Sequence, residues 1–284
     1  MDQATAPKAE AGSVRSADGT KIGYVKLGVG APVVITHGAL LTHESWMAVA
    51  QELSARFTCY VMDRRGRGLS GDASGYSVER EVEDIQAVLA AAGPGAALIG
   101  HSYGGFCSLL TALKTDVSRL VIYEAPWPIH GPAHTTASAL CAPLIAEGKN
   151  EKAVVTFLQD AGLVPRGPLS NLWMALPMWL KAKALPSWPG LVPLAPTVVR
   201  EFSAVDAAGP SLARFSALRM PALFILGTES KQPHIRDTMI ELAKFVPNAK
   251  LVELKGQGHM AQQLAPKLVA SEIATFLSSM AKAA

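Results

Sequence analysis

Cysteine is scarce in this chain of 284 residues, which holds only Cys59, Cys107 and Cys141. Three cysteines are too few for a disulfide framework, and their spacing is not that of a zinc-type ligand cluster. Because Cys59 and Cys107 lie in apolar segments, we expect buried thiols without a partner.

Long hydrophobic runs and clusters of basic residues are also missing. Hydrophobic residues make up 49% of the chain, yet charged residues interrupt every run long enough to cross a membrane. The net charge is +3, but Lys and Arg are scattered, so nucleic acid is not an expected partner. Residues 1–12 are Ala-rich and polar, without the apolar core of a signal peptide, and predict a loose N-terminal tail on a cytoplasmic protein that does not bind membranes.

Short apolar segments rich in β-branched residues alternate with helical stretches along most of the chain. A hairpin is expected at 14–26, turning at Asp18-Gly19. The predicted strands are 32–36, 57–62, 96–100, 119–124, 222–226 and 250–254, and the predicted helices are 46–54, 78–92, 104–113, 235–246 and 266–280. This alternation predicts an α/β fold, with a mostly parallel central sheet, helices on both faces, and reactive groups at the carboxyl ends of the strands.

Residues 126–212 break the alternation. This segment holds many of the prolines and four of the five tryptophans, which are Trp127, Trp173, Trp179 and Trp188. We predict an inserted helical cap on a core formed by residues 13–125 and 213–284. The tryptophans are expected both to pack the cap onto the sheet and to line an apolar substrate cavity.

The segment Gly100-His101-Ser102-Tyr103-Gly104-Gly105 follows a predicted buried strand and precedes a predicted helix. A serine at such an abrupt turn adopts a strained backbone, and glycines beside it let the helix approach the strand. The turn lifts the Ser102 hydroxyl clear of the sheet. The amide of Tyr103 then lies at a helix start, where unpaired N–H groups favour negative charge. This context indicates an activated serine nucleophile.

This motif is one of four that occur in the same order as in the α/β-hydrolase family, and together they resemble that family over nearly the whole chain. They are the segments Thr36-His37-Gly38-Ala39, Asp63-Arg64-Arg65-Gly66-Arg67-Gly68-Leu69-Ser70, Gly100 to Gly105, and Gly256-Gln257-Gly258-His259.

The resemblance implies a role for each signature. The backbone amides of Ala39 and Tyr103 would form an oxyanion hole, and His259 would serve as general base and then general acid toward Ser102. His37 is expected to form structural hydrogen bonds. His101 alternates away from Ser102, so its expected role is packing. The segment from Asp63 to Ser70 is expected to be a turn locked by Asp-to-backbone and Asp-to-Arg hydrogen bonds.

In this family a carboxylate orients the catalytic histidine and completes a Ser-His-acid triad, and here the position of that acid departs from the family pattern. The usual aspartate lies three residues after the glycine that ends the penultimate strand, and Ser230 stands there. Glu229 is one residue early, whereas Glu124 ends the strand expected beside the nucleophile strand. We favour Glu124 as the acid and keep Glu229 as the alternative; Glu124 could also merely cap the hinge at Pro126.

These residues predict hydrolysis of a carboxylic ester, lactone or thioester of a small apolar substrate through an acyl-enzyme, without metal or cofactor. Ser102 argues against dehalogenases and epoxide hydrolases of this fold, which have aspartate at this position. Perhydrolases and hydroxynitrile lyases stay open, whereas carbon–carbon bond hydrolases usually carry a longer Ser/Gly-rich oxyanion loop. A binding protein that holds an apolar ligand without turnover is the alternative from another class. A second copy of the chain could pair through the cap.

Overall fold

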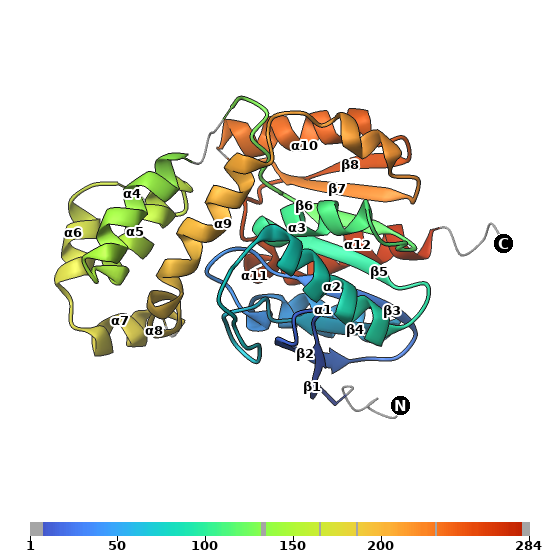
Figure 1. Cartoon of the computed structure of the whole chain (residues 1–284), viewed down its shortest axis with the longest axis horizontal. Coiled ribbons are helices and arrows are strands. Elements are labelled where there is room, and N and C mark those ends of the chain that lie inside the picture. Colours follow the sequence, from blue (N-terminus) through green and yellow to red (C-terminus); the bar gives the residue numbers. More distant parts are fainter. Residues whose placement is uncertain (1–7, 132–134, 165, 186, 231, 280–284) are drawn as a thin grey trace.

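The computed structural model describes residues 8–131, 135–164, 166–185, 187–230 and 232–279. Its centre is an eight-stranded sheet with the strand order β1-β2-β4-β3-β5-β6-β7-β8 (Figure 1). The strands are β1 (Glu10–Arg15), β2 (Lys21–Leu27), β3 (Ala31–Thr36), β4 (Phe57–Met62), β5 (Ala97–His101), β6 (Leu120–Tyr123), β7 (Ala222–Gly227) and β8 (Ala249–Leu254). β1 and β2 pair antiparallel, β2 pairs antiparallel with β4, and the other neighbours are parallel.

The sheet confirms the predicted α/β class. Each of the six expected parallel strands is present, because runs of β-branched and aliphatic residues suit a sheet covered on both faces. The prediction of a loose tail is wrong for residues 10–12, because they belong to β1 and pair with residues 24–26 of β2. Residues 1–7 lie outside the described residues.

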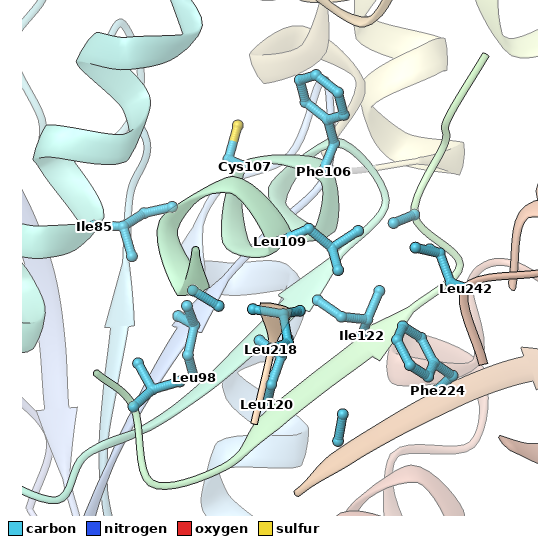
Figure 2. Packing of buried hydrophobic residues seen from close by; sticks show 14 of the residues in the cluster. Ile85, Leu98, Phe106, Cys107, Leu109, Leu120, Ile122, Leu218, Phe224 and Leu242 are labelled. Carbon is cyan, nitrogen blue, oxygen red and sulfur yellow. The ribbon is translucent and has the colours of Figure 1, made fainter. Parts of the chain in front are cut away.

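Helices cover both faces of the sheet. They are α1 (Met47–Leu53), α2 (Val78–Ala92), α3 (Tyr103–Ala112), α10 (Pro233–Phe245), α11 (Ala261–Leu264) and α12 (Pro266–Ser278). The side chains of Leu98 and Ile122 pack beneath α3 on one face (Figure 2). Ile99 and Val121, one residue along their strands, join α1 and α12 on the other face. This two-residue alternation gives the molecule two apolar layers that hold the strand ends in place.

The predicted cap is present as a group of helices beside the sheet (Figure 1). They are α4 (Thr135–Ala146), α5 (Asn150–Asp160), α6 (Pro168–Ala175), α7 (Met178–Ala184), α8 (Trp188–Leu191) and α9 (Ala195–Ala207). The cap has its own apolar cluster, which includes Cys141, Phe157, Trp188 and Phe202. The expected boundary at residue 126 needs a correction, because Trp127 is fully buried in the core of the sheet against Phe106 and Phe215.

All three cysteines are buried and free, as the sequence predicted. No helix in the described part of the chain is both long and apolar enough to cross a membrane.

Candidate active site

The turn between β5 and α3 holds Ser102 in a strained conformation, with φ 52° and ψ −127°. Its glycines are required by close packing. A Cβ at Gly104 would lie 2.4 Å from the backbone oxygen of His37, and a Cβ at Gly100 would lie 2.4 Å from Ser108 Oγ. The sequence therefore folds into a sharp strand-to-helix turn with the serine at its tip.

Ser102 borders a cavity of about 470 Å³ between the carboxyl edge of the sheet and the cap. His101 and His259 line it from the sheet, and Phe157 and Phe202 line it from the cap. Most of the other lining side chains are apolar: Leu40, Leu41, Pro126, Leu158, Leu163, Val164, Leu185, Leu191, Leu194, Ile235 and Met260. A partly open and largely apolar pocket, with polar side chains as a minority of its lining, suits a small organic substrate.

The tryptophans expected in this cavity are elsewhere. Trp127 is part of the core, and Trp173 and Trp188 meet edge to face inside the cap with ring centroids 5.2 Å apart. Trp179 is 66% exposed. The cavity wall is instead built largely from leucine, phenylalanine and valine, while Trp127, Trp173 and Trp188 belong to the apolar clusters of the core and the cap.

The loop after β3 lies against the nucleophile. A Cβ at Gly38 would be 2.8 Å from Ser102 Cβ, so this glycine permits the approach. Leu40 takes a positive φ of 55°, which turns the chain sharply after Ala39. Ala39 and Ser102 both line the cavity, and within the described chain no acceptor pairs with the Ala39 amide. The Ala39 amide is thus available as a hydrogen-bond donor at the cavity wall.

Tyr103 can contribute to the site only through its backbone. Its side chain is fully buried, and its hydroxyl lies 2.6 Å from that of Tyr76. Its amide is the first of α3, and the first N–H groups of a helix have no partner within the helix. Ala39 lines the cavity with Ser102, and Tyr103 directly follows Ser102 at the start of α3, so both amides stay the predicted oxyanion-hole donors.

The structure brings His259 and Glu124 together. His259 Nδ1 lies 2.6 Å from Glu124 Oε2. The other carboxylate oxygen, Oε1, accepts hydrogen bonds from the Gly227 amide and from Ser230 Oγ, both at 2.6 Å. Glu124 is fully buried and takes a positive φ of 49° just beyond β6. Both carboxylate oxygens of Glu124 therefore have hydrogen-bond partners, and Oε2 is the oxygen that contacts the imidazole.

Glu229 lies apart from this contact. It is exposed, and its amide donates to the backbone oxygen of Gln257 at 2.8 Å. Between the two carboxylates that the sequence left open, the geometry places Glu124 at the imidazole.

The backbone around His259 is held by two buried side chains that sequence reasoning did not assign to the site. His101 Nε2 donates to the backbone oxygen of His259 at 2.9 Å, and the two rings have centroids 4.8 Å apart. Burial lowers the pKa of His101 well below its usual value, so the ring stays neutral. The Tyr123 hydroxyl donates to the backbone oxygen of Gly258 and accepts from the Ala261 amide. Nothing in the local sequence shows these contacts, since they join residues more than 130 positions apart.

Ser102 and His259 face the same cavity, but Ser102 Oγ donates no hydrogen bond to any described residue. Catalytic hydrogen bonds of this kind commonly tighten when substrate is present.

His37 has the structural role that its place in the sequence predicted. Its Nε2 accepts from the Arg64 amide at 3.2 Å, and its Nδ1 donates to the backbone oxygen of Gly38 at 2.9 Å. Burial, together with the guanidinium groups of Arg64 and Arg67, lowers the pKa of His37 to about 3. A neutral His37 therefore holds the loop after β3 in place through its hydrogen bonds to Gly38 and Arg64.

Asp63 locks the charged turn through the backbone, as expected. Its carboxylate accepts from the amides of His43 at 2.7 Å and Leu69 at 2.8 Å. It also contacts His43 Nδ1 at 2.7 Å, and this hydrogen bond raises the pKa of His43. Two arginines of the turn pair with carboxylates of α2 and not with Asp63: Arg65 binds Asp84, and Arg64 binds Glu81. The turn is thus a structural support, and its charges are neutralised within the protein.

No group of three or more histidine, cysteine, aspartate or glutamate side chains that could hold a metal ion occurs among the residues that the structure describes.

Comparison with known proteins agrees with this architecture. An α/β hydrolase from Sphaerobacter thermophilus has a solved structure that superposes with a TM-score of 0.80 at 34% identity, covering 94% of this chain and all of that one. A 2-(acetamidomethylene)succinate hydrolase from Mesorhizobium japonicum is 25% identical over 259 residues, which are 89% of this chain and 90% of that protein. An N-formylmaleamate deformylase from Pseudomonas putida is 34% identical over 128 residues, 43% of this chain and 47% of that protein. The profile of the Alpha/beta hydrolase family matches residues 33–272. The chain belongs to the α/β hydrolase family.

Proposed function

We propose that this α/β hydrolase cleaves a carboxylic ester, lactone or thioester of a small apolar substrate through a covalent acyl-enzyme. Ser102 is the nucleophile, His259 the general base and acid, and Glu124 the carboxylate that orients His259. The amides of Ala39 and Tyr103 hold the oxyanion. The observation that carries the proposal is the 2.6 Å contact between His259 Nδ1 and Glu124 Oε2, beside a cavity that Ser102 also borders.

The reaction follows from the two nitrogens of the imidazole. Because Nδ1 faces Glu124, it carries the proton and leaves Nε2 as the base. Nε2 takes the Ser102 proton as Oγ bonds to the substrate carbonyl carbon, and the carbonyl oxygen becomes an oxyanion between the two amides. Collapse expels the alcohol, which takes the proton from His259. Water then attacks the acyl-enzyme with the same proton transfers, releasing the acid and restoring Ser102.

The test is hydrolysis of p-nitrophenyl acetate and butyrate, together with labelling by a fluorophosphonate probe. We expect the wild type to turn over at least one ester and to be labelled at Ser102. The matched Ser102→Ala variant should lose both the labelling and about 10³-fold or more of the rate. Equal rates for the two proteins would disprove the proposal, as would a folded wild type that neither hydrolyses nor is labelled.

One relative favours a second candidate bond, the amide bond of an N-formyl group. The Pseudomonas putida relative is named an N-formylmaleamate deformylase. A third relative, from Edwardsiella ictaluri, is a pimeloyl-[acyl-carrier protein] methyl ester esterase that is 37% identical over 81 residues and agrees with ester cleavage. The same serine chemistry would serve an N-formyl group. Rates on a matched pair of a formyl ester and an N-formyl amine, measured with wild type and Ser102→Ala, distinguish the two bonds.

A further inference from the structure

The charges that line the cavity beside Ser102 are of one sign. Two carboxylates belong to its wall, Glu44 from the short 3-10 helix His43–Trp46 and Asp160 from the end of α5. Among the described residues of this wall there is no lysine or arginine. A cleft with low-dielectric walls focuses the field of the charges that line it. The cavity therefore favours a positively charged group over an anion.

Asp160 carries much of this field inside the cavity. It is the last residue of α5, and the carbonyl groups at the end of a helix add partial negative charge to that of the carboxylate. The Asp160 side chain is only 21% exposed. Arg166 contacts its Oδ1 at 3.4 Å, but the arginine side chain is 71% exposed and lies outside the cavity wall. Solvent screens so exposed a guanidinium, and the wall stays negative.

Gln232 adds an unpaired acceptor to the same wall from the core. It lies at the start of α10, lines the cavity and is 8% exposed. Its Nε2 donates to the backbone oxygen of Ala161, next to Asp160, and a Cβ at Gly162 would lie 2.9 Å from that nitrogen. With Nε2 in use, Oε1 is the acceptor, and no described residue donates to it. A buried acceptor without a donor is unfavourable, so this wall favours a ligand that brings N–H groups.

Two aromatic rings complete the wall. Phe157 lies three residues before Asp160 on α5, a spacing that places both side chains on one face of the helix. Phe202 of α9 meets Phe157 with ring centroids 5.1 Å apart, and both rings line the cavity. Aromatic faces attract cations. A carboxylate, an amide acceptor and two aromatic rings are thus gathered on one side of the cavity.

We propose that the substrate is a cationic ester, whose chain ends in an ammonium group that binds at the wall formed by Phe157, Asp160, Phe202 and Gln232. The proposal rests on the function given above and specifies its substrate class. Asp160 supplies the opposite charge, and Gln232 Oε1 is the acceptor for an ammonium N–H. The leucines of the cavity hold the hydrocarbon part of the chain.

Four ethyl esters of equal chain length test the proposal: ethyl hexanoate, ethyl 6-hydroxyhexanoate, ethyl 6-aminohexanoate and monoethyl adipate. At neutral pH they end in a methyl, a hydroxyl, an ammonium and a carboxylate group. Acid release in a pH-stat measures kcat/KM. The amino ester should exceed ethyl hexanoate about tenfold and monoethyl adipate about 10²-fold, and added salt should reduce the second ratio.

Either half of an ester can face this wall, so the same end groups are also placed on the alcohol side, as acetates of hexanol and its 6-hydroxy, 6-amino and 6-carboxylate analogues. An amino ester preferred in one series supports the proposal. An amino ester that is no better than the uncharged or the anionic ester in both series would overturn it.

Two variants test the residues. Asp160→Asn keeps the shape of the side chain and should lower the ratio of amino ester to adipate about tenfold. Gln232→Met removes the acceptor and should lower the ratio of amino ester to hexanoate about threefold. The matched control is Glu147→Gln, another cap carboxylate, which pairs with Lys149 away from the cavity and should keep both ratios within about twofold. A folded Asp160→Asn enzyme with wild-type ratios would overturn the role of Asp160. If Gln232→Met fails to fold by circular dichroism, Asp160→Asn and the wild-type series decide.

Failure of the underlying function gives a different pattern. Equal rates for wild type and Ser102→Ala on all of these esters would remove the proposed function, and the substrate class with it. A wild type that depends on Ser102 but shows no preference among the end groups would remove the substrate class alone.

Discussion

At the scale of single residues, backbone strain is concentrated at the site. In the described part of the chain, the non-glycine residues with positive φ are Leu40, Ser102 and Glu124. They belong to the proposed oxyanion loop, nucleophile turn and triad acid, in that order. Each such conformation costs about 1–3 kcal/mol, which the surrounding packing must offset. Leu40 and Ser102 line the cavity and Glu124 contacts His259, so strain at these three positions supports the proposed triad and oxyanion loop.

Substitution of the two candidate acids separates their roles. Glu124→Gln keeps the size of the side chain but removes the negative charge beside His259, so kcat should fall about 10³- to 10⁴-fold. Glu229→Gln changes an exposed carboxylate and should keep kcat within about twofold. Ester hydrolysis by the two purified variants measures both. A larger loss for Glu229→Gln than for Glu124→Gln would reverse the assignment.

A pH prediction follows from His37. Its pKa falls from the usual 6.5 to about 3 in the folded protein, chiefly because the ring is buried. Between these values the unfolded chain binds a proton at His37 and the folded chain does not. The stability that His37 contributes is therefore complete above about pH 6.5 and decreases as the pH falls, by up to about 1.4 kcal/mol per pH unit.

Nuclear magnetic resonance of the histidine rings gives the measurement. The His37 signals should stay constant from pH 8 to pH 5. The His43 signals should titrate above 6.5, since the Asp63 carboxylate raises the pKa of that ring. A His37 ring that titrates near 6.5 would contradict its burial.

At the scale of elements, the nucleophile turn requires a close approach of α3 to the loop after β3. In Gly104→Ala the new Cβ would meet two backbone oxygens, at 2.4 Å from His37 and 2.8 Å from Thr36. Alanine favours a helix over glycine by about 1 kcal/mol, but neither oxygen can move aside freely. We therefore expect a net loss of about 1–3 kcal/mol in the free energy of unfolding.

Urea unfolding of Gly104→Ala measures this loss, and Gly71→Ala is its control. The nearest atom to a Cβ at Gly71 is 3.6 Å away, which is ordinary contact. The control should change stability by less than about 0.5 kcal/mol. Equal stabilities for the two variants would mean that the helix is not pressed against the loop.

The elements themselves were predictable from the sequence. β4 and α2 occupy the predicted ranges 57–62 and 78–92, because runs of apolar residues and helical periodicity report burial directly. The choice between Glu124 and Glu229 could not be made with the same clarity, since it depends on how β6 and β7 lie beside each other and on a positive φ at Glu124. The burial of Trp127 in the main core was also missed. A tryptophan in a proline-rich segment does not reveal which layer it joins.

At the scale of the whole molecule, a buried charge cluster joins the cap to the core. Glu201 on α9 contacts Arg64 Nη2 at 2.8 Å and also pairs with Arg67, and all three side chains are fully buried. The two arginines hold the pKa of Glu201 down to about 2, so it stays ionised. Because Phe202 follows it on α9 and lines the cavity, this cluster fixes one wall of the site relative to Ser102. Sequence patterns could not show a contact between residues more than 130 positions apart.

Glu201→Gln tests this link between cap and core. The change removes a negative charge that faces two buried guanidinium groups, leaving Arg64 with Glu81 at 2.6 Å. Breaking a buried ion pair in this way costs about 3–5 kcal/mol, which urea unfolding would measure.

Arg200→Gln, on the same helix, is the matched control. It removes an ion pair with Asp72, whose side chains are 24% and 43% exposed, and a cation–π contact with Tyr76, and should cost about 1–2 kcal/mol, less than Glu201→Gln. We also expect a higher KM for ester substrates in Glu201→Gln, because the α9 wall is no longer fixed, whereas Arg200→Gln should keep its KM. A Glu201→Gln variant as stable as Arg200→Gln would mean that the cap is held by its apolar contacts alone.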